Sequence, residues 1–311
     1  MKPAFDINGA DVVEFGVGLD EGENERFTLV PAGVEVQAIL KQMAIATRDE
    51  MRAVRPDGLA YEPSEKYDSP EHLFVPTDDG MAAHFKQLHA ANNMEPDANA
   101  LDDPSKVFCY FARFKFRKGR QCLTAVRRAT SFKGILKSPL IRFLGDALRI
   151  VEEQTFKLDQ DFDVLVDDDR VYILRPAGFE FVGHLDAEIA KAVPGNVQSV
   201  KADLPFVDFT AIQNYATDHP RAARYLASIR SQKLAKNVDK GSLKRLCKST
   251  NVNVQEVGGK LLVDPKSIMD FLGVLDRRLY EVELIKGLPE PFRAARRVRI
   301  SSSSHEPAPA R

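Results

Sequence analysis

The sequence has few cysteines and no long hydrophobic segment, and both absences limit what the protein can be. Cys109, Cys122 and Cys247 form no close pair, so their spacing predicts neither a disulfide framework nor a zinc site. Free thiols are typical of a reducing compartment. No apolar run approaches the roughly eighteen residues of a membrane span. An acidic residue, Asp6, occurs close to the N-terminus, and this region lacks the apolar core of a signal peptide. We therefore expect a cytoplasmic protein.

The sequence also lacks the short motifs of common enzymes. It contains no phosphate-binding glycine loop of the Walker type and no Gly-x-Ser-x-Gly nucleophile elbow. His84 and His89 are five residues apart with no cysteine nearby, which is typical of ordinary surface or half-buried histidines. We therefore expect no catalytic residues, no metal site and no cofactor.

Acidic residues are absent from Pro104 to Gly145, and this absence is the most informative one. These 42 residues carry eleven Lys and Arg, although the whole chain is balanced, with 44 basic and 45 acidic side chains. Crowded like charges repel and destabilise the folded state unless an anion or an acidic surface compensates them. A polyanion is therefore the expected partner.

The basic segment begins with a predicted β-hairpin. From Phe108 to Phe116 the aromatic residues occupy alternate positions, which places them inward and the intervening cations outward. Lys118-Gly119 is the predicted turn, and residues 121–127 return as the second strand. We expect the cations of this hairpin to contact phosphates: Arg113, Lys115, Arg117, Lys118, Arg120, Arg127 and Arg128.

Two further basic clusters follow. Between Arg221 and Lys248 nine Lys and Arg stand against Asp239 alone, and a third cluster lies at 293–299. From the second cluster we expect phosphate contacts by Lys233, Lys236, Lys240, Lys244 and Arg245. Cations bind phosphate oxygens without reading base identity, so the three clusters favour sequence-tolerant binding of nucleic acid, duplex DNA above all. The alternative is a set of solvated faces neutralised by the acidic regions 62–103 and 152–169.

The hydrophobic pattern predicts an α+β protein with two ordered parts and a tail. Residues 1–183 are expected to form an antiparallel sheet with flanking helices, and 184–300 a mainly helical portion with a small hairpin at Gly258-Gly259. Residues 301–311 have the composition of a disordered tail. Residues 62–103 are expected to be mostly loop, with one helix at 81–91, and Ser242 is the expected N-cap of a helix. Residues 241–264 weakly resemble part of a winged helix.

Carboxylates alternate at Asp159, Asp161 and Asp163. This spacing matches the start of an EF-hand loop, but Val164 stands where glycine is required and Arg170 where the bidentate Glu belongs. The pattern therefore favours a polar turn that leads into a strand. The alternative is a divalent-metal site and hence a nuclease.

Residues 156–174, with the sequence FKLDQDFDVLVDDDRVYIL, are followed by Gly178-Phe179-Glu180. This pattern resembles the KwaB-like family, the B component of the Kiwa anti-phage defence system of bacteria, and residues 114–119 are compatible with it. The likeness would cover roughly residues 100–290. It implies a DNA-binding component without an established catalytic motif, which works beside a multi-span protein of the inner membrane and interferes with phage DNA replication and transcription. In the resemblance the three aspartates are a landmark of unknown role.

The charge pattern and the resemblance together predict a DNA-binding component of an anti-phage system. We expect a homodimer in the cytoplasm that a membrane-protein partner recruits to the inner membrane. Three alternatives stay open: a metal-dependent nuclease at the three aspartates, an adaptor whose basic faces bind acidic loops of a partner protein, and a peripheral membrane protein that binds anionic lipids.

Overall fold

The protein folds into two compact units. The computed structural model describes residues 6–22, 24–55, 57–67, 70–91, 94–116, 122–129, 141–144, 147–150, 157–285 and 288–294. Unit 1 comprises residues 1–62 and 67–186, and unit 2 comprises 63–66 and 187–311. The boundary predicted from the sequence lies after Gly183. No helix among the described residues has both the length and the apolar character needed to cross a bilayer.

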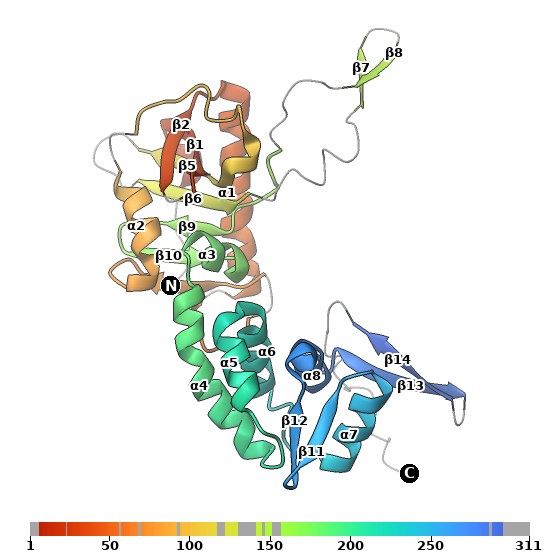
Figure 1. Cartoon of the computed structure of the whole chain (residues 1–311). Helices are drawn as coiled ribbons and strands as arrows, with labels where there is room; N and C mark the ends of the chain where they lie inside the picture. Colours follow the sequence, from red (N-terminus) through yellow and green to blue (C-terminus); the bar gives the residue numbers. More distant parts are fainter. Residues whose placement is uncertain are drawn as a thin grey trace, which may run out of the picture. The chain divides into compact units, whose positions relative to one another are not determined.

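An eight-stranded sheet forms the centre of unit 1 (Figure 1). Its strand order is β2-β1-β5-β6-β9-β10-β4-β3, and neighbouring strands are antiparallel except β3 and β4. The strands are β1 (Val12–Asp20), β2 (Glu25–Val30), β3 (Leu59–Ala60), β4 (Leu73–Pro76), β5 (Val107–Lys115), β6 (Leu123–Arg128), β9 (Val164–Val166) and β10 (Arg170–Ile173). A separate antiparallel pair is formed by β7 (Ile141–Leu144) and β8 (Ala147–Ile150).

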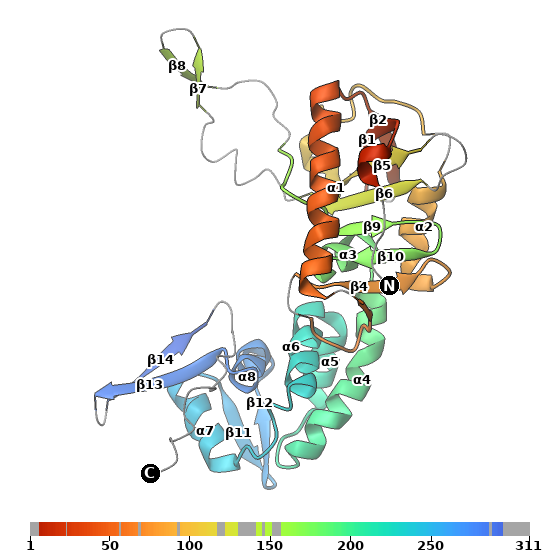
Figure 2. The same ribbon diagram turned by 180° about the vertical axis from the view of Figure 1, so that it is seen from behind.

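Helices cover both faces of this sheet. The long helix α1 (Val34–Val54) runs along one face, while α2 (Ala83–Ala90) and α3 (Pro176–Val182) lie against the other, as the opposite views in Figures 1 and 2 show. Short 3₁₀ turns occur at Ile7–Gly9, Gly80–Ala82 and Pro104–Lys106. Because both faces are covered, β5 is buried at every position from Val107 to Phe114.

The face beneath α1 holds the main hydrophobic core. Leu40, Met43 and Met51 of α1 are almost fully buried against alternate residues of the strands, among them Tyr110 and Phe114. In the sequence these positions recur at helical spacing, which is why one side of α1 faces the core. Burial of apolar side chains of this size contributes about 1.5–3 kcal/mol each.

Unit 2 is mainly helical, as predicted. It contains α4 (Asp186–Asp203), which starts at the unit boundary, α5 (Thr210–Asp218), α6 (Pro220–Ser231), α7 (Lys240–Ser249) and α8 (Ile268–Leu275). A 3₁₀ turn at Pro265–Ser267 precedes α8. Two hairpins complete it, one formed by β11 (Val254–Val257) and β12 (Lys260–Val263), the other by β13 (Leu279–Ile285) and β14 (Leu288–Arg293). The α+β prediction is confirmed, whereas the sequence pattern did not predict β3, β4, β7, α3, α5 or β14.

Local hydrogen bonding and glycine conformation explain the start of α7 and the turn between β11 and β12. Its N-cap is Asp239, whose side chain accepts a hydrogen bond from the backbone N–H of Ser242 at 2.8 Å, so the prediction of Ser242 as the cap is wrong. After β11 the chain reverses at Gly258 and Gly259, with φ of 58° and 81°. Both values lie in the left-handed region that glycine adopts most easily, and the predicted two-residue hairpin is confirmed.

A polar cluster anchors α6 inside unit 2. Asp276 is fully buried and accepts hydrogen bonds from the hydroxyl of Ser228 and from Nε of Arg278, the latter at 2.6 Å. Although burial opposes it, the hydrogen bond with Asp276 raises the pKa of Arg278. The guanidinium also lies over the ring of Tyr225, 4.8 Å from its centroid. This buried carboxylate is therefore compensated.

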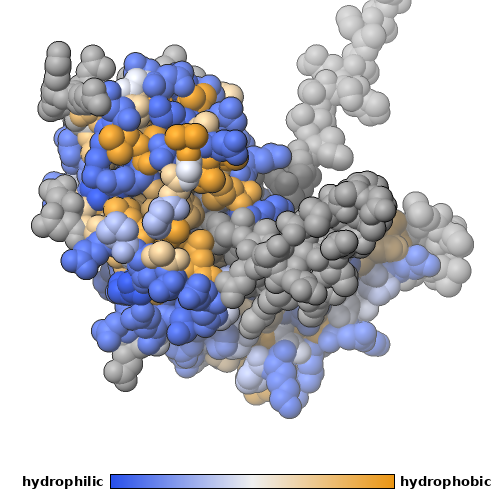
Figure 3. Space-filling view, turned by 90° about the horizontal axis from the view of Figure 1, so that it is seen from above, coloured by the Kyte–Doolittle hydropathy of each residue, from blue (hydrophilic) through white to orange (hydrophobic). Residues whose placement is uncertain are grey.

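The surface of unit 1 carries some apolar area. In the space-filling view of Figure 3, apolar side chains form a patch on the visible face, surrounded by hydrophilic ones. The exposed large apolar residues of this unit include Val12, Val34 and Ile39. Patches of this kind are common at interaction surfaces, and the predicted homodimer stays a prediction.

Candidate nucleic-acid interface

Arg113 does not lie on the surface, so the prediction that it faces outward is wrong. Its side chain is only 2% exposed, because α2 covers the sheet face from which it projects. The guanidinium donates to the backbone carbonyls of His89, at 3.3 Å, and Ala91, both at the end of α2. Glu14 of β1 lies 3.8 Å from the guanidinium. Arg113 therefore joins a helix to the sheet and is not available to a phosphate.

The neighbouring hairpin cations differ in their surroundings. Lys115 is partly exposed and forms an ion pair with Glu14, with 2.5 Å between Nζ and Oε1. Arg128 is exposed, and its guanidinium lies 3.8 Å from the centre of the Phe181 ring. Arg117, Lys118 and Arg120 lie outside the described residues.

Arg127 is held by the three aspartates that the sequence singled out, here called the acidic triad (Asp159, Asp161 and Asp163). Its Nη1 lies 2.9 Å from Asp161 and 2.8 Å from Asp163, and its Nε lies 3.2 Å from Asp159. Arg175 adds a bidentate pair to Asp161 at 2.6 and 2.7 Å. Breaking such a buried charge network costs several kcal/mol, because it leaves charges without partners. Arg127 thus compensates carboxylates of its own unit.

The acidic triad is an ion-paired structural feature. Burial raises the pKa of Asp163, and it outweighs the opposing effects of Arg127 and the backbone N–H of Arg128. Although burial works against it, the attraction of the three carboxylates raises the pKa of Arg127. Gly178 of α3 packs so closely here that a β-carbon would overlap the carboxylate of Asp163. The guanidiniums of Arg127 and Arg175 thus supply positive charge to the three carboxylates, as a divalent metal ion would.

The cations of unit 2 are more exposed. We define the basic surface of unit 2 as Lys233, Lys236, Lys244, Arg245 and Lys248. All five are exposed. Lys244, Arg245 and Lys248 lie on the outer side of α7, whereas its buried residues are Leu243 and Cys247. Among the described residues, no carboxylate pairs with Lys233, Lys236, Arg245 or Lys248.

Glu256 of β11 partly neutralises this surface. Its carboxylate lies 2.5 Å from Nζ of Lys240 and 3.0 Å from Nζ of Lys244. These two hydrogen bonds lower the pKa of Glu256 to about 2. Lys240 also donates to the carbonyl of Gly259 at 2.8 Å, so it has more hydrogen-bond partners within this unit than the other predicted phosphate-binding residues there.

A groove of 620 Å³ runs beside α7. It is lined by Gly241, Lys244, Arg245, Lys248, Asn251, Val252, Asn253 and Val254. Three cations and two amide side chains thus share one depression, which is a suitable set of donors for phosphate oxygens. Lys248, Asn251 and Asn253 were not among the predicted phosphate-binding residues. The four-residue spacing of Lys244 and Lys248 could have indicated the first, but the asparagines follow the helix and carry no such signal.

Other basic residues of unit 2 are bound within it. Arg224 donates to the carbonyls of Pro63 and Glu65, and Arg230 to the carbonyl of Ser64 and the carboxylate of Glu65. Arg293 pairs with Asp270 at 2.7 Å. The rest of the third basic cluster, at 296–299, lies outside the described residues.

The fold and the charge distribution define an α+β protein whose second unit presents an exposed cationic surface. The family model described as Kiwa protein KwaB-like matches residues 106–284, more than half of the chain. The protein therefore belongs to the KwaB-like family, as the resemblance predicted, and it is a component of a Kiwa anti-phage defence system. No curated protein and no solved structure matches the chain.

Proposed function

We propose that the protein binds duplex DNA without base preference through the basic surface of unit 2. The observation that carries the proposal is the set of five exposed cations of this surface, three of which line the α7 groove. Four of the five, Lys233, Lys236, Arg245 and Lys248, have no carboxylate partner among the described residues. Phosphate contacts of this kind supply affinity and position but no sequence information. Arg113 and Arg127, which are engaged inside unit 1, take no part.

This binding is the means by which the protein acts in the defence system. We propose that it blocks replication or transcription of phage DNA by occupying the template, without cleaving it. A multi-span membrane protein of the same system would recruit it to the inner membrane, and the chain would act as a homodimer. Family membership supports a partnership within the Kiwa system. The partner's identity as a membrane protein rests on the resemblance.

Fluorescence anisotropy with labelled duplexes of two unrelated sequences tests the proposal. The test variant carries Lys244→Glu, Arg245→Glu and Lys248→Glu, and each duplex is titrated at several salt concentrations. Each phosphate that is no longer neutralised reduces the slope of log affinity against log salt concentration by about 0.9, so the three reversals should flatten it by about 2.7. The two duplexes should bind equally.

The matched control carries Lys86→Glu, Lys191→Glu and Lys201→Glu, which change the net charge equally at exposed positions outside the basic surface. It should bind DNA nearly as well as the unchanged protein. Equal loss in both variants would mean that overall charge alone governs binding. Unchanged affinity in the test variant would place the DNA elsewhere, and Mg²⁺-dependent nicking of the duplex would replace the proposal with a nuclease.

A further inference from the structure

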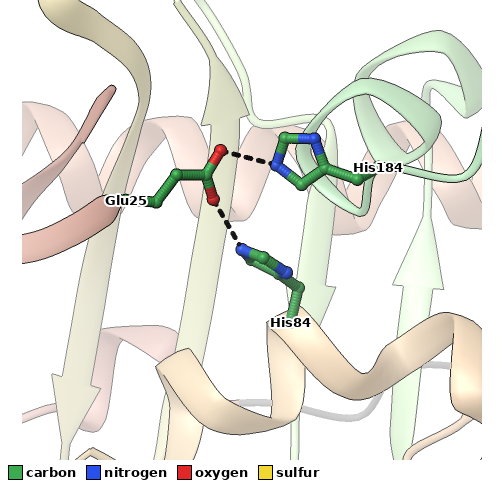
Figure 4. Close-up of side chains that lie close together, drawn as sticks. All are labelled: Glu25, His84 and His184. Carbon is green, nitrogen blue, oxygen red and sulfur yellow. Dashed lines mark hydrogen bonds and ion pairs between the residues drawn. The ribbon is translucent and has the colours of Figure 1, made fainter. Parts of the chain in front are cut away.

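Three side chains from separate elements of unit 1 meet at one point on its surface. Glu25 is the first residue of β2, His84 lies in the first turn of α2, and His184 follows α3. The carboxylate of Glu25 points between the two imidazoles (Figure 4), with 2.9 Å from Oε2 to Nε2 of His84 and 2.7 Å from Oε1 to Nε2 of His184. One donor atom from each side chain lies within 4.8 Å of the others.

We propose that Glu25, His84 and His184 bind a divalent transition-metal ion, with Zn²⁺ as the occupant. Two imidazole nitrogens and one carboxylate oxygen are a common protein ligand set for zinc, at about 2.0–2.2 Å each. Ligand atoms in tetrahedral positions at such distances are about 3.4 Å apart. The two oxygen–nitrogen spacings, 2.7 and 2.9 Å, are shorter than this value, and no spacing among the three atoms exceeds 4.8 Å. Small side-chain rotations therefore bring all three atoms to one ion.

The backbone at His184 supports a role for its side chain. The residue has a φ of 52°, in the left-handed region, and it ends α3 in a Schellman motif. In this motif the N–H of Leu185 bonds to the carbonyl of Glu180 at 3.0 Å and that of His184 to Phe181 at 3.4 Å. Glycine is the usual residue at such a position, because a β-carbon there costs about 1–2 kcal/mol. The backbone conformation sets the direction of the Cα–Cβ bond of His184, and its ring lies beside Glu25.

Aromatic rings orient both imidazoles. Phe27 of β2 packs edge-on against His84, with 5.9 Å between ring centroids, and Phe108 of β5 lies 6.1 Å from His184. The two phenylalanines also contact each other at 5.9 Å, so they form one apolar wall beside the site. Such a wall restricts water on one side of a metal ion and strengthens its attraction to the carboxylate. The side chain of His184 is half exposed, which leaves the ion an entry path.

Three protein ligands leave the fourth tetrahedral position to water, the arrangement of an open zinc site. Glu25 and His84 precede residue 106, where the family match begins. His184 lies within the match. All three residues belong to unit 1, whereas the residues proposed to bind DNA belong to unit 2.

The test uses the untagged full-length chain, freed of metal with a chelator and then titrated with Zn²⁺ by calorimetry. We expect one ion per chain. Glu25→Gln, His84→Gln and His184→Asn should each weaken binding at least about 10-fold, the smaller effect seen even for outer-sphere partners of metal ligands. Asparagine is chosen at 184 because it tolerates a positive φ. His219→Gln removes an exposed histidine of unit 2 and should bind Zn²⁺ normally.

A second measurement needs no variant. Diethylpyrocarbonate modifies accessible imidazoles, and peptide mass spectrometry locates the products. Zn²⁺ should protect His84 and His184 together, while His219 reacts equally with and without the ion. Three results would overturn the proposal: no stoichiometric binding of Zn²⁺, binding by the three variants as tight as that of the unchanged protein, or modification of both histidines that Zn²⁺ does not alter. The cluster would then be a set of hydrogen bonds that joins β2, α2 and the end of α3.

Discussion

Unit 1 and unit 2 contain the same number of lysines and arginines, 22 each, but use them differently. In unit 1, Arg113 and Arg127 are enclosed and bonded to carbonyls or carboxylates of the same unit. In unit 2, Lys244, Arg245 and Lys248 of α7 are exposed, and of these only Lys244 pairs with a described carboxylate, that of Glu256. A cluster of basic residues in a sequence therefore indicates a binding surface only when the fold leaves it uncompensated.

The largest expected effect is on the stability of unit 1. Arg127→Ala removes the shared partner of the acidic triad and leaves Asp163 buried beside one fewer positive charge, so it should lower the free energy of unfolding by about 3–5 kcal/mol. Urea unfolding followed by circular dichroism measures this. Arg128→Ala is the matched control, because the neighbouring side chain is exposed and its loss should cost under about 1 kcal/mol. Equal effects of the two changes would contradict the assignment of Arg127 as a structural residue.

A smaller effect on unit 1 depends on pH. Burial lowers the pKa of His72, whose ring is fully enclosed beside β3 and β4. The unfolded chain then binds a proton at a higher pH than the folded one. The contribution of neutral His72 to the free energy of unfolding is therefore complete above about pH 6.5. It declines as the pH falls from there through the pKa of the folded state, by at most about 1.4 kcal/mol per pH unit.

Urea titrations at pH 7.5 and 5.5 check this dependence on His72. The decline on acidification should be smaller in His72→Phe, which removes the titrating group, and unchanged in His219→Gln, which alters an exposed histidine of unit 2. A decline of the same size in His72→Phe and the unchanged protein would assign it to other histidines.

The smallest expected effect is a rise in DNA affinity in unit 2. Glu256→Gln frees Lys240 and Lys244 from their shared carboxylate, so affinity should rise roughly three-fold and the salt dependence should steepen by about 0.9 for each additional phosphate that the freed lysines neutralise. A pKa of about 2 keeps Glu256 ionised at any usual pH, so substitution and not acidification reveals the effect. Glu188→Gln, which frees Lys191 on α4, removes the same charge and should leave affinity unchanged.

Local patterns in the sequence predicted the elements better than their surroundings. The alternation along 108–116 correctly indicated a strand. The composition of the acidic stretch 62–103 did not predict β4, nor that α2 packs against the sheet. This packing is what buries Arg113. A period of two cannot show whether the second face of a sheet meets water or another helix. The same alternation is therefore compatible with both outcomes.

The site residues illustrate the same limit. The basic residues of α7 were predictable, because their spacing on one helix already places them on its outer side. The partners of Arg127 lie more than thirty residues further along the chain, and Glu25, His84 and His184 come from three distant elements. Only the strand order brings such groups together. The sequence positions of His84 and His184 therefore give no sign that both lie beside Glu25.

The strap of residues 63–66 has a consequence for how the chain can be divided. These four residues belong to unit 2, where their carbonyls bond to Arg224 and Arg230 of α6, although both flanking segments belong to unit 1. The polypeptide therefore passes from one unit to the other three times. A fragment that starts at residue 187 would lack part of its own structure, and a complementary fragment ending at 186 would carry the missing piece. Cleavage at that junction should accordingly yield two fragments that reassociate.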